Sequence, residues 1–144
     1  RLELPPARVE AVAEDPGAIS AAPFTWPLAV LDDGSARDLS TLPAPDSGEV
    51  WMLYATGLPD GYARLTWPGA DEGISHGISF TFDPAHVTAV TTFATFGGWR
   101  GLQTILPEAG VGYPADLREA VSASTSGVMK AGEVVEFEVH VAVW

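Results

Sequence analysis

The end of the chain, residues 134–144, constrains the fold most strongly, because its apolar and polar residues alternate. Valine or phenylalanine occupies positions 135, 137, 139, 141 and 143, and Glu136, Glu138 and His140 lie between them. A period of two places the apolar side chains on one face of a β-strand and the polar side chains on the other. This pattern predicts a strand that packs one face against another layer.

Other segments of the chain also favour strands. Val50–Tyr54 is an uninterrupted apolar run, typical of a strand buried on both faces. Leu58-Pro59-Asp60-Gly61 has the composition of a tight turn, so residues 50–67 are predicted to form a hairpin. In all, we expect strands at residues 8–12, 28–31, 50–54, 62–67, 77–82, 87–96 and 134–144.

Helical signal is confined to a short stretch near residues 115–122. Pro114 and Asp116 precede Leu117, as proline and an acid commonly do at a helix start. The chain shows no βαβ alternation and no internal repeat. We therefore expect residues 1–144 to form a single all-β domain, an antiparallel β-sandwich with one short helix.

Aromatic residues are expected to anchor the core. The proline-rich stretch 18–48 shows little periodicity, and we expect Phe24 and Trp26 to hold it to the core. Trp51, Trp67 and Trp144 are predicted core residues as well.

Charge and residue types exclude several function classes. The net charge is −12 with only seven basic residues, which argues against nucleic acid and anionic membrane surfaces as partners. There is no cysteine, so thiolate chemistry and zinc–thiolate sites are excluded. No apolar run approaches the ~20 residues of a membrane span. No secretory leader is present either, and we expect a cytoplasmic protein.

Glu108 is the first candidate for chemistry. It is the only acid between Asp83 and Asp116, and its neighbours are apolar or glycine. A carboxylate in such surroundings is desolvated, which disfavours its charged form and suits it to proton transfer. The alternative is an ordinary surface glutamate in a loop.

Three further residues suit a binding site. Trp99 and Arg100 lie between glycines, which let a backbone approach a ligand closely, and an exposed indole offers a flat apolar face to a sugar ring. The alternative is that Trp99 folds back onto its own sheet. Tyr113 either donates a hydrogen bond to a sugar hydroxyl or packs beside the Tyr-Pro turn.

Two other patterns carry less weight. Gly73-Ile74-Ser75-His76-Gly77 matches the nucleophile elbow of hydrolases, but that motif needs a strand before it and a helix after it, and here a strand is expected to follow. The chain's histidines, His76, His86 and His140, share no metal-ligand spacing, so no metal site is expected. His86 is expected in a turn and His140 on a solvated face.

The order of these residues resembles the C-terminal part of the aldose 1-epimerase (galactose mutarotase-like) family. The family stretch reads Leu-Glu-Pro-x-x-Gly-Tyr-Pro, and Glu108 falls on its glutamate, counting five residues back from Tyr113. Here Pro107 precedes the glutamate and Ala109 follows it, a departure that puts the local backbone in doubt. The similarity covers most of the chain through residues 24–27, 38–40, 79–84 and 97–101.

The resemblance implies a galactose mutarotase-like supersandwich, of which this chain would be the C-terminal half. It implies an isomerase that interconverts the α and β anomers of a neutral monosaccharide, with Glu108 as the base and no metal or organic cofactor. The family's acid is a histidine from upstream motifs, on which none of the histidines here falls. His76 and His86 are where we would look for that acid.

Two expectations follow if the chain is half of a sandwich that carries the base but not the acid. The isolated chain should be weakly active or inactive, because losing an acid or base typically costs about 10²–10⁴-fold. It should also expose an apolar sheet face and associate with a missing N-terminal half or with itself. The alternative function is a non-catalytic carbohydrate-binding or structural β-sandwich domain, which the shifted proline at position 107 favours.

Overall fold

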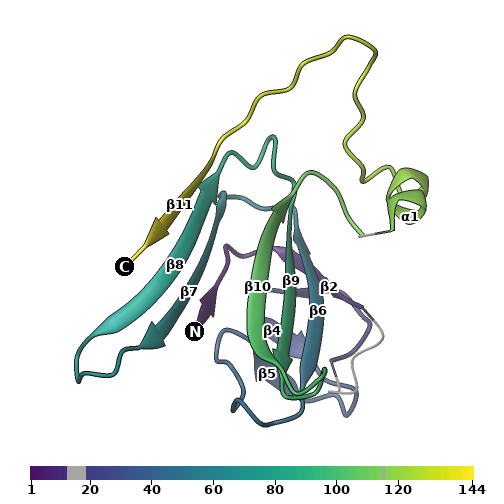
Figure 1. The fold of residues 1–144 in the computed structure, drawn as a ribbon. Helices are drawn as coiled ribbons and strands as arrows, with labels where there is room; N and C mark the ends of the chain where they lie inside the picture. The colour runs from purple at the N-terminus through teal and green to yellow at the C-terminus, as the bar shows by residue number, and fades with distance from the viewer. Residues whose placement is uncertain (13–18, 115) are drawn as a thin grey trace.

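The chain folds into two antiparallel β-sheets packed face to face, as predicted (Figure 1). The computed structural model describes residues 1–12, 19–114 and 116–144. The smaller sheet has the strand order β1-β7-β8-β11, and the larger sheet has the order β10-β9-β6-β2-β3-β4-β5. The elements are β1 (Leu2–Glu3), β2 (Arg8–Ala11), β3 (Phe24–Thr25), β4 (Leu28–Val30), β5 (Ala36–Asp38), β6 (Val50–Thr56), β7 (Tyr62–Pro68), β8 (Ser75–Phe82), β9 (Ala89–Phe96), β10 (Gln103–Gly110), α1 (Leu117–Ser122) and β11 (Val139–Val143).

The core lies between the two sheets and is built from alternate residues of each strand. Trp51 and Leu53 of β6 and Val90 of β9 are at most 2% exposed, and they cluster with Leu2 of the smaller sheet. Trp51 meets the Phe96 ring edge-on, with 5.2 Å between ring centroids. Period-two alternation therefore decides which face of the larger sheet turns inward.

The aromatic anchors were predicted in part. Phe24 and Trp26 are 8% and 5% exposed and hold the long connection to the core, as expected. Trp67 and Trp144 are 42% and 46% exposed, so their assignment to the core is wrong. Trp67 borders a hollow of about 490 Å³ between the sheets, and Trp144 covers Gly77 on the outside of the smaller sheet.

The predicted hairpin over residues 50–67 is also wrong. Both strands exist, but β6 pairs with β2 and β9, whereas β7 pairs with β1 and β8. The turn between them therefore crosses from one sheet to the other. Turn chemistry specifies a change of direction but not the hydrogen-bonding partner of the strand that follows.

Strand β10 was not predicted, and it contains Glu108, which the sequence alone had placed in a loop. Pro107 obscures the strand pattern, because proline is normally excluded from central strands. It is accommodated here because β10 ends the larger sheet and pairs only with β9 within the described residues.

Strand β11 confirms the predicted C-terminal strand in part. Pairing with β8 covers Val139–Val143 only, and residues 134–138 form an extended arm leading to it (Figure 1). The valine face of β11 is exposed, by 37% at Val139, 56% at Val141 and 73% at Val143. The alternation thus predicted the strand correctly, although the described residues provide no layer opposite that face.

Helix α1 confirms the predicted short helix. Asp116 caps it by accepting hydrogen bonds from the backbone N–H groups of Arg118 and Glu119, at 2.8 and 3.2 Å. Ala115, the first residue of the predicted helix, lies outside the described residues. Within the described chain, no helix combines the length and apolar character that crossing a membrane requires.

Candidate functional site

The outer face of the larger sheet, turned away from the smaller sheet, carries Glu108. Strand pairing places Glu108 opposite Thr91, Thr91 opposite Tyr54, and Tyr54 opposite Glu10. Side chains directly opposite one another in a sheet point to the same face. These residues therefore form one row across β10, β9, β6 and β2, with a carboxylate at each end.

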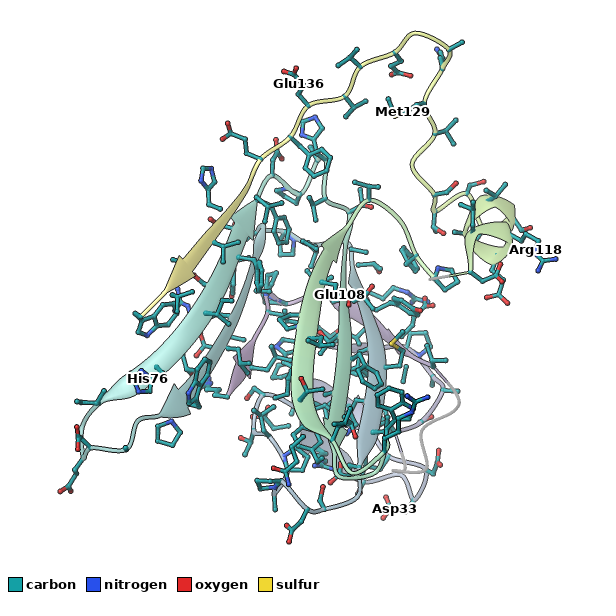
Figure 2. All side chains as sticks on the ribbon, viewed as in Figure 1. Asp33, His76, Glu108, Arg118, Met129 and Glu136 are labelled. Carbon is teal, nitrogen blue, oxygen red and sulfur yellow. The ribbon has the colours of Figure 1, made fainter. Side chains whose placement is uncertain are left out.

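Glu108 itself is exposed to solvent. The prediction that its carboxylate is desolvated is therefore wrong for the described chain. The alternative, a surface glutamate, is right about the exposure and wrong only about the loop. Its position at the edge of the sheet explains the exposure. Figure 2 shows Glu108 on β10, at the border of the outer face.

The turn between β9 and β10 brings Trp99 over the same face. The Trp99 ring meets Phe93 edge-on, with 5.7 Å between centroids. The backbone N–H of Trp99 donates to the Thr95 hydroxyl at 3.0 Å. Phe93 is paired with Leu106, two residues along β10 from Glu108. Trp99 remains 42% exposed. The indole thus packs on its own sheet, as the alternative had it, and still presents a surface to solvent.

Arg100 follows Trp99 in a backbone conformation that favours glycine, with φ at 53°. This conformation turns the side chain back over its neighbour, and the guanidinium carbon lies 4.6 Å from the centroid of the Trp99 ring. The pair forms a cation–π contact on the surface. Arg100 therefore adds hydrogen-bond donors beside an exposed aromatic ring.

Tyr113 reaches the other end of the row. Its ring lies 6.0 Å from that of Tyr54, centroid to centroid, at an angle of 33°. The Thr125 hydroxyl donates to the Tyr113 carbonyl and holds the segment in place. Glu10, Tyr54 and Tyr113 line a hollow of about 410 Å³. Tyr113 therefore packs beside its turn and also borders a cavity that contains a carboxylate.

The histidines are dispersed over the molecule. His76 is on β8 of the smaller sheet, near the Trp67 ring (Figure 2). His140 is exposed on β11, 3.2 Å from Glu138, as expected for a solvated histidine. His86 lies in the predicted turn, 3.4 Å from Asp83, and shares a hollow of about 620 Å³ with Tyr113. Of the two positions considered for the acid, His86 is thus the one associated with a predicted site residue.

The other patterns give no catalytic group. Ser75 begins β8, so the Gly-x-Ser-x-Gly segment leads into a strand rather than a helix. Within the described part of the chain, no group of three or more His, Asp or Glu side chains is arranged to hold a metal ion.

Taken together, the outer face gathers Glu108, Trp99, Arg100 and Tyr113 from three segments. Adjacent strands are about 4.8 Å apart, so Glu108 and the Tyr54 backbone are separated by roughly 10 Å. Of the aromatic rings on this face, Trp99 is exposed, Phe93 and Tyr113 are half-buried, and Tyr54 is buried. Thr91, Tyr54, Phe93 and Glu10 were missed because only the strand register places them on this face.

Comparison with models of protein families, with curated proteins and with solved structures found no match to this chain.

Proposed function

We propose that this chain is an aldose 1-epimerase-like domain that binds a neutral monosaccharide on the outer face of the larger sheet. One observation carries the proposal. Glu108, Trp99 and Tyr113 lie on the same face of the larger sheet, through the pairing of Glu108 with Thr91 and the ring contacts of Trp99 with Phe93 and of Tyr113 with Tyr54. A neutral sugar fits better than an anionic one, because carboxylates end the row at Glu108 and Glu10 and the net charge is −12.

In the proposed reaction Glu108 acts as the base. Its carboxylate takes the proton from the anomeric hydroxyl while an acid protonates the ring oxygen, and the ring opens to the free aldehyde. Rotation about the bond to the aldehyde carbon and reclosure with reversed proton transfers gives the other anomer. Trp99 offers its exposed ring to the C–H side of the sugar, and Tyr113 and Arg100 offer hydrogen bonds to its hydroxyls.

Exchange between anomers, followed by NMR over a panel of aldoses, tests the enzymatic proposal. We expect the chain to accelerate exchange weakly, because only the base is in place, and Glu108→Gln to remove that acceleration. Glu72→Gln, which alters an exposed acid in the turn between β7 and β8, is the matched control and should retain it. Equal rates for the wild type and Glu108→Gln would contradict the proposal.

His86→Ala identifies the acid in the same assay. If His86 supplies the proton to the ring oxygen, its loss should remove the weak acceleration, whereas an unchanged rate would rule out His86 as the acid. His76→Ala is its control, since His76 lies on the other sheet.

The second candidate function is carbohydrate binding without catalysis, and the exposure of Glu108 favours it. An acid–base catalyst normally works in surroundings that exclude water, and this carboxylate is solvated. A binder would retain sugar affinity in Glu108→Gln and lose it in Trp99→Ala, by about tenfold for an aromatic contact. Titration of both variants with the sugars of the panel separates the two functions.

A further inference from the structure

The open edge of β11 is the feature that the proposed function leaves unused. Within the described residues, β11 pairs on one side only, with β8. Trp144 and Gly77 exchange both backbone hydrogen bonds, at 2.9 and 3.1 Å. Bonded pairs alternate along an antiparallel ladder, so the N–H and C=O groups of Val139, Val141 and Val143 point to the open edge. Such an edge is a template for another strand.

The open edge of β10 differs in one respect. The Gly97 N–H donates to the Leu102 carbonyl at 2.8 Å, and the same alternation turns the nitrogen of Pro107 toward the open side. Proline has no N–H to offer there, which is a common protection of sheet edges. Residues 134–144 contain neither proline nor lysine. The edge of β11 is therefore the less protected of the two.

The apolar side chains of this segment are also uncovered. Val135 and Phe137, in the arm that leads to β11, are 45% and 47% exposed and border the hollow of about 620 Å³ that His86 and Tyr113 also line. A run of exposed apolar residues on an unpaired strand is typical of an interaction surface. Figure 2 places Glu136 on the same arm, extended away from both sheets.

We propose that the occupant of this edge is a second copy of the chain, paired antiparallel through residues 134–144 about a two-fold axis at Val139. In this register Phe137 lies opposite the other copy's Val141, and Val135 opposite its Val143. Of these, Val141 and Val143 direct their backbone groups to the edge, and pairing would bring Val135 and Phe137 of the arm into the same alternation. The two smaller sheets then join into one continuous sheet.

The positions of Glu138 and His140 favour this register over the registers shifted to centre on an adjacent residue. Centring on Val139 places Glu138 opposite His140 twice, once on each side of the axis. A shift that centres on Glu138 keeps two Glu–His pairs, between Glu136 and His140, but adds two glutamates directly opposite one another. A shift that centres on His140 has no Glu–His pair. Like charges directly opposite destabilise a sheet, whereas a glutamate opposite a protonated histidine stabilises it. Self-complementarity of this kind is what a two-fold interface requires.

Disulfide trapping tests the register, because the chain has no cysteine of its own. In Val139→Cys the paired Cα atoms would be about 5.5 Å apart, within the range of a disulfide. In Ala142→Cys they would be about 20 Å apart, three residues from the axis on each side. We expect mild oxidation to cross-link Val139→Cys and leave Ala142→Cys monomeric on a non-reducing gel. Equal cross-linking of both variants would overturn the proposal.

Sedimentation of the unmodified chain tests the dimer without introducing a disulfide bond. The expected species is a dimer of about 30 kDa, twice the 15.1 kDa chain. Glu138→Lys should weaken it about tenfold, since both charge pairs become unfavourable. Adding His140→Glu to Glu138→Lys should restore the dimer. Glu136→Lys should have little effect, because residue 136 lies opposite the other copy's Ala142.

A monomer at every concentration up to about 100 µM would overturn the dimer. The dimer would also be overturned if the edge of β11 were found paired only with further strands of a longer polypeptide. Neither result depends on sugar chemistry, so the dimer and the proposed function fail separately.

Discussion

At the scale of single residues, Arg37 and Glu49 show how a polar contact ties an outer strand to the core. The guanidinium of Arg37 on β5 meets the Glu49 carboxylate with two hydrogen bonds of 2.7 and 3.1 Å. The indole N–H of Trp51 donates to the same carboxylate at 3.1 Å. Glu49 is 19% exposed, so little water is available to replace a lost partner.

Arg37→Met should lower the free energy of unfolding by about 1–3 kcal/mol, because it leaves a half-buried carboxylate without its cation. Urea unfolding followed by tryptophan fluorescence measures the loss. Arg8→Met is the matched control, since Arg8 and Glu10 form an exposed pair that should contribute less than about 1 kcal/mol. Equal losses in both variants would contradict this reasoning.

Thr92 is a buried polar residue on β9. Its side chain is fully buried on β9, and its hydroxyl has no hydrogen-bond partner within the described residues. Thr92→Val keeps the shape and removes the unsatisfied group, so we expect a gain of about 1 kcal/mol in the free energy of unfolding. Thr91→Val, on the outer face of the same strand, should change it by less than about 0.5 kcal/mol. A loss of stability in Thr92→Val would indicate a buried water that satisfies the hydroxyl.

At the scale of elements, the crossing between β6 and β7 decides which sheet each strand joins. Gly61 lies at this crossing, and its carbonyl accepts a hydrogen bond from the Phe82 N–H at 2.9 Å. A Cβ at Gly61 would lie 1.7 Å from the Phe82 carbonyl oxygen, a backbone atom that cannot move aside alone. Close approach of two backbones therefore requires glycine here.

Gly61→Ala should destabilise the fold by about 3 kcal/mol through this clash. Gly110→Ala is the control, because a Cβ there would meet its nearest neighbour at an ordinary 3.6 Å. Thermal unfolding of the two variants makes the comparison. A small effect of Gly61→Ala would mean that the crossing can shift without breaking the pairing of β7 with β8.

At the scale of the whole molecule, the sandwich is closed along most of its length and open beside β11. The larger sheet ends at β10, while β11 extends the smaller sheet with its valine face uncovered. The charge of −12 per chain opposes association, and salt screens that repulsion. Association through β11 should therefore strengthen as ionic strength rises.

Dimerisation predicts a melting temperature that depends on protein concentration, because a partner that binds the folded state stabilises it. Between about 1 and 100 µM we expect a rise of about 2–4 °C. Glu138→Lys should flatten this dependence and Glu136→Lys should not. Scanning calorimetry at several concentrations provides the measurement.

The sequence by itself determined the all-β class, the short capped helix, most strand positions and the buried Phe24, Trp26 and Trp51. These follow from local periodicity, turn residues and capping, which act over a few neighbouring residues. Its choice of Glu108, Trp99, Arg100 and Tyr113 as site residues stays a prediction.

Only the tertiary structure decided that β6 and β7 belong to different sheets, that Glu108 is exposed on a strand, and that Tyr54, Thr91 and Phe93 share its face. The physical reason is that strand pairing joins segments distant in sequence, and the register of that pairing sets which side chains meet. Burial follows from the same pairing: Trp67 and Val143 carry core-like patterns, but β7 and β11 reach past the sheet that would cover them.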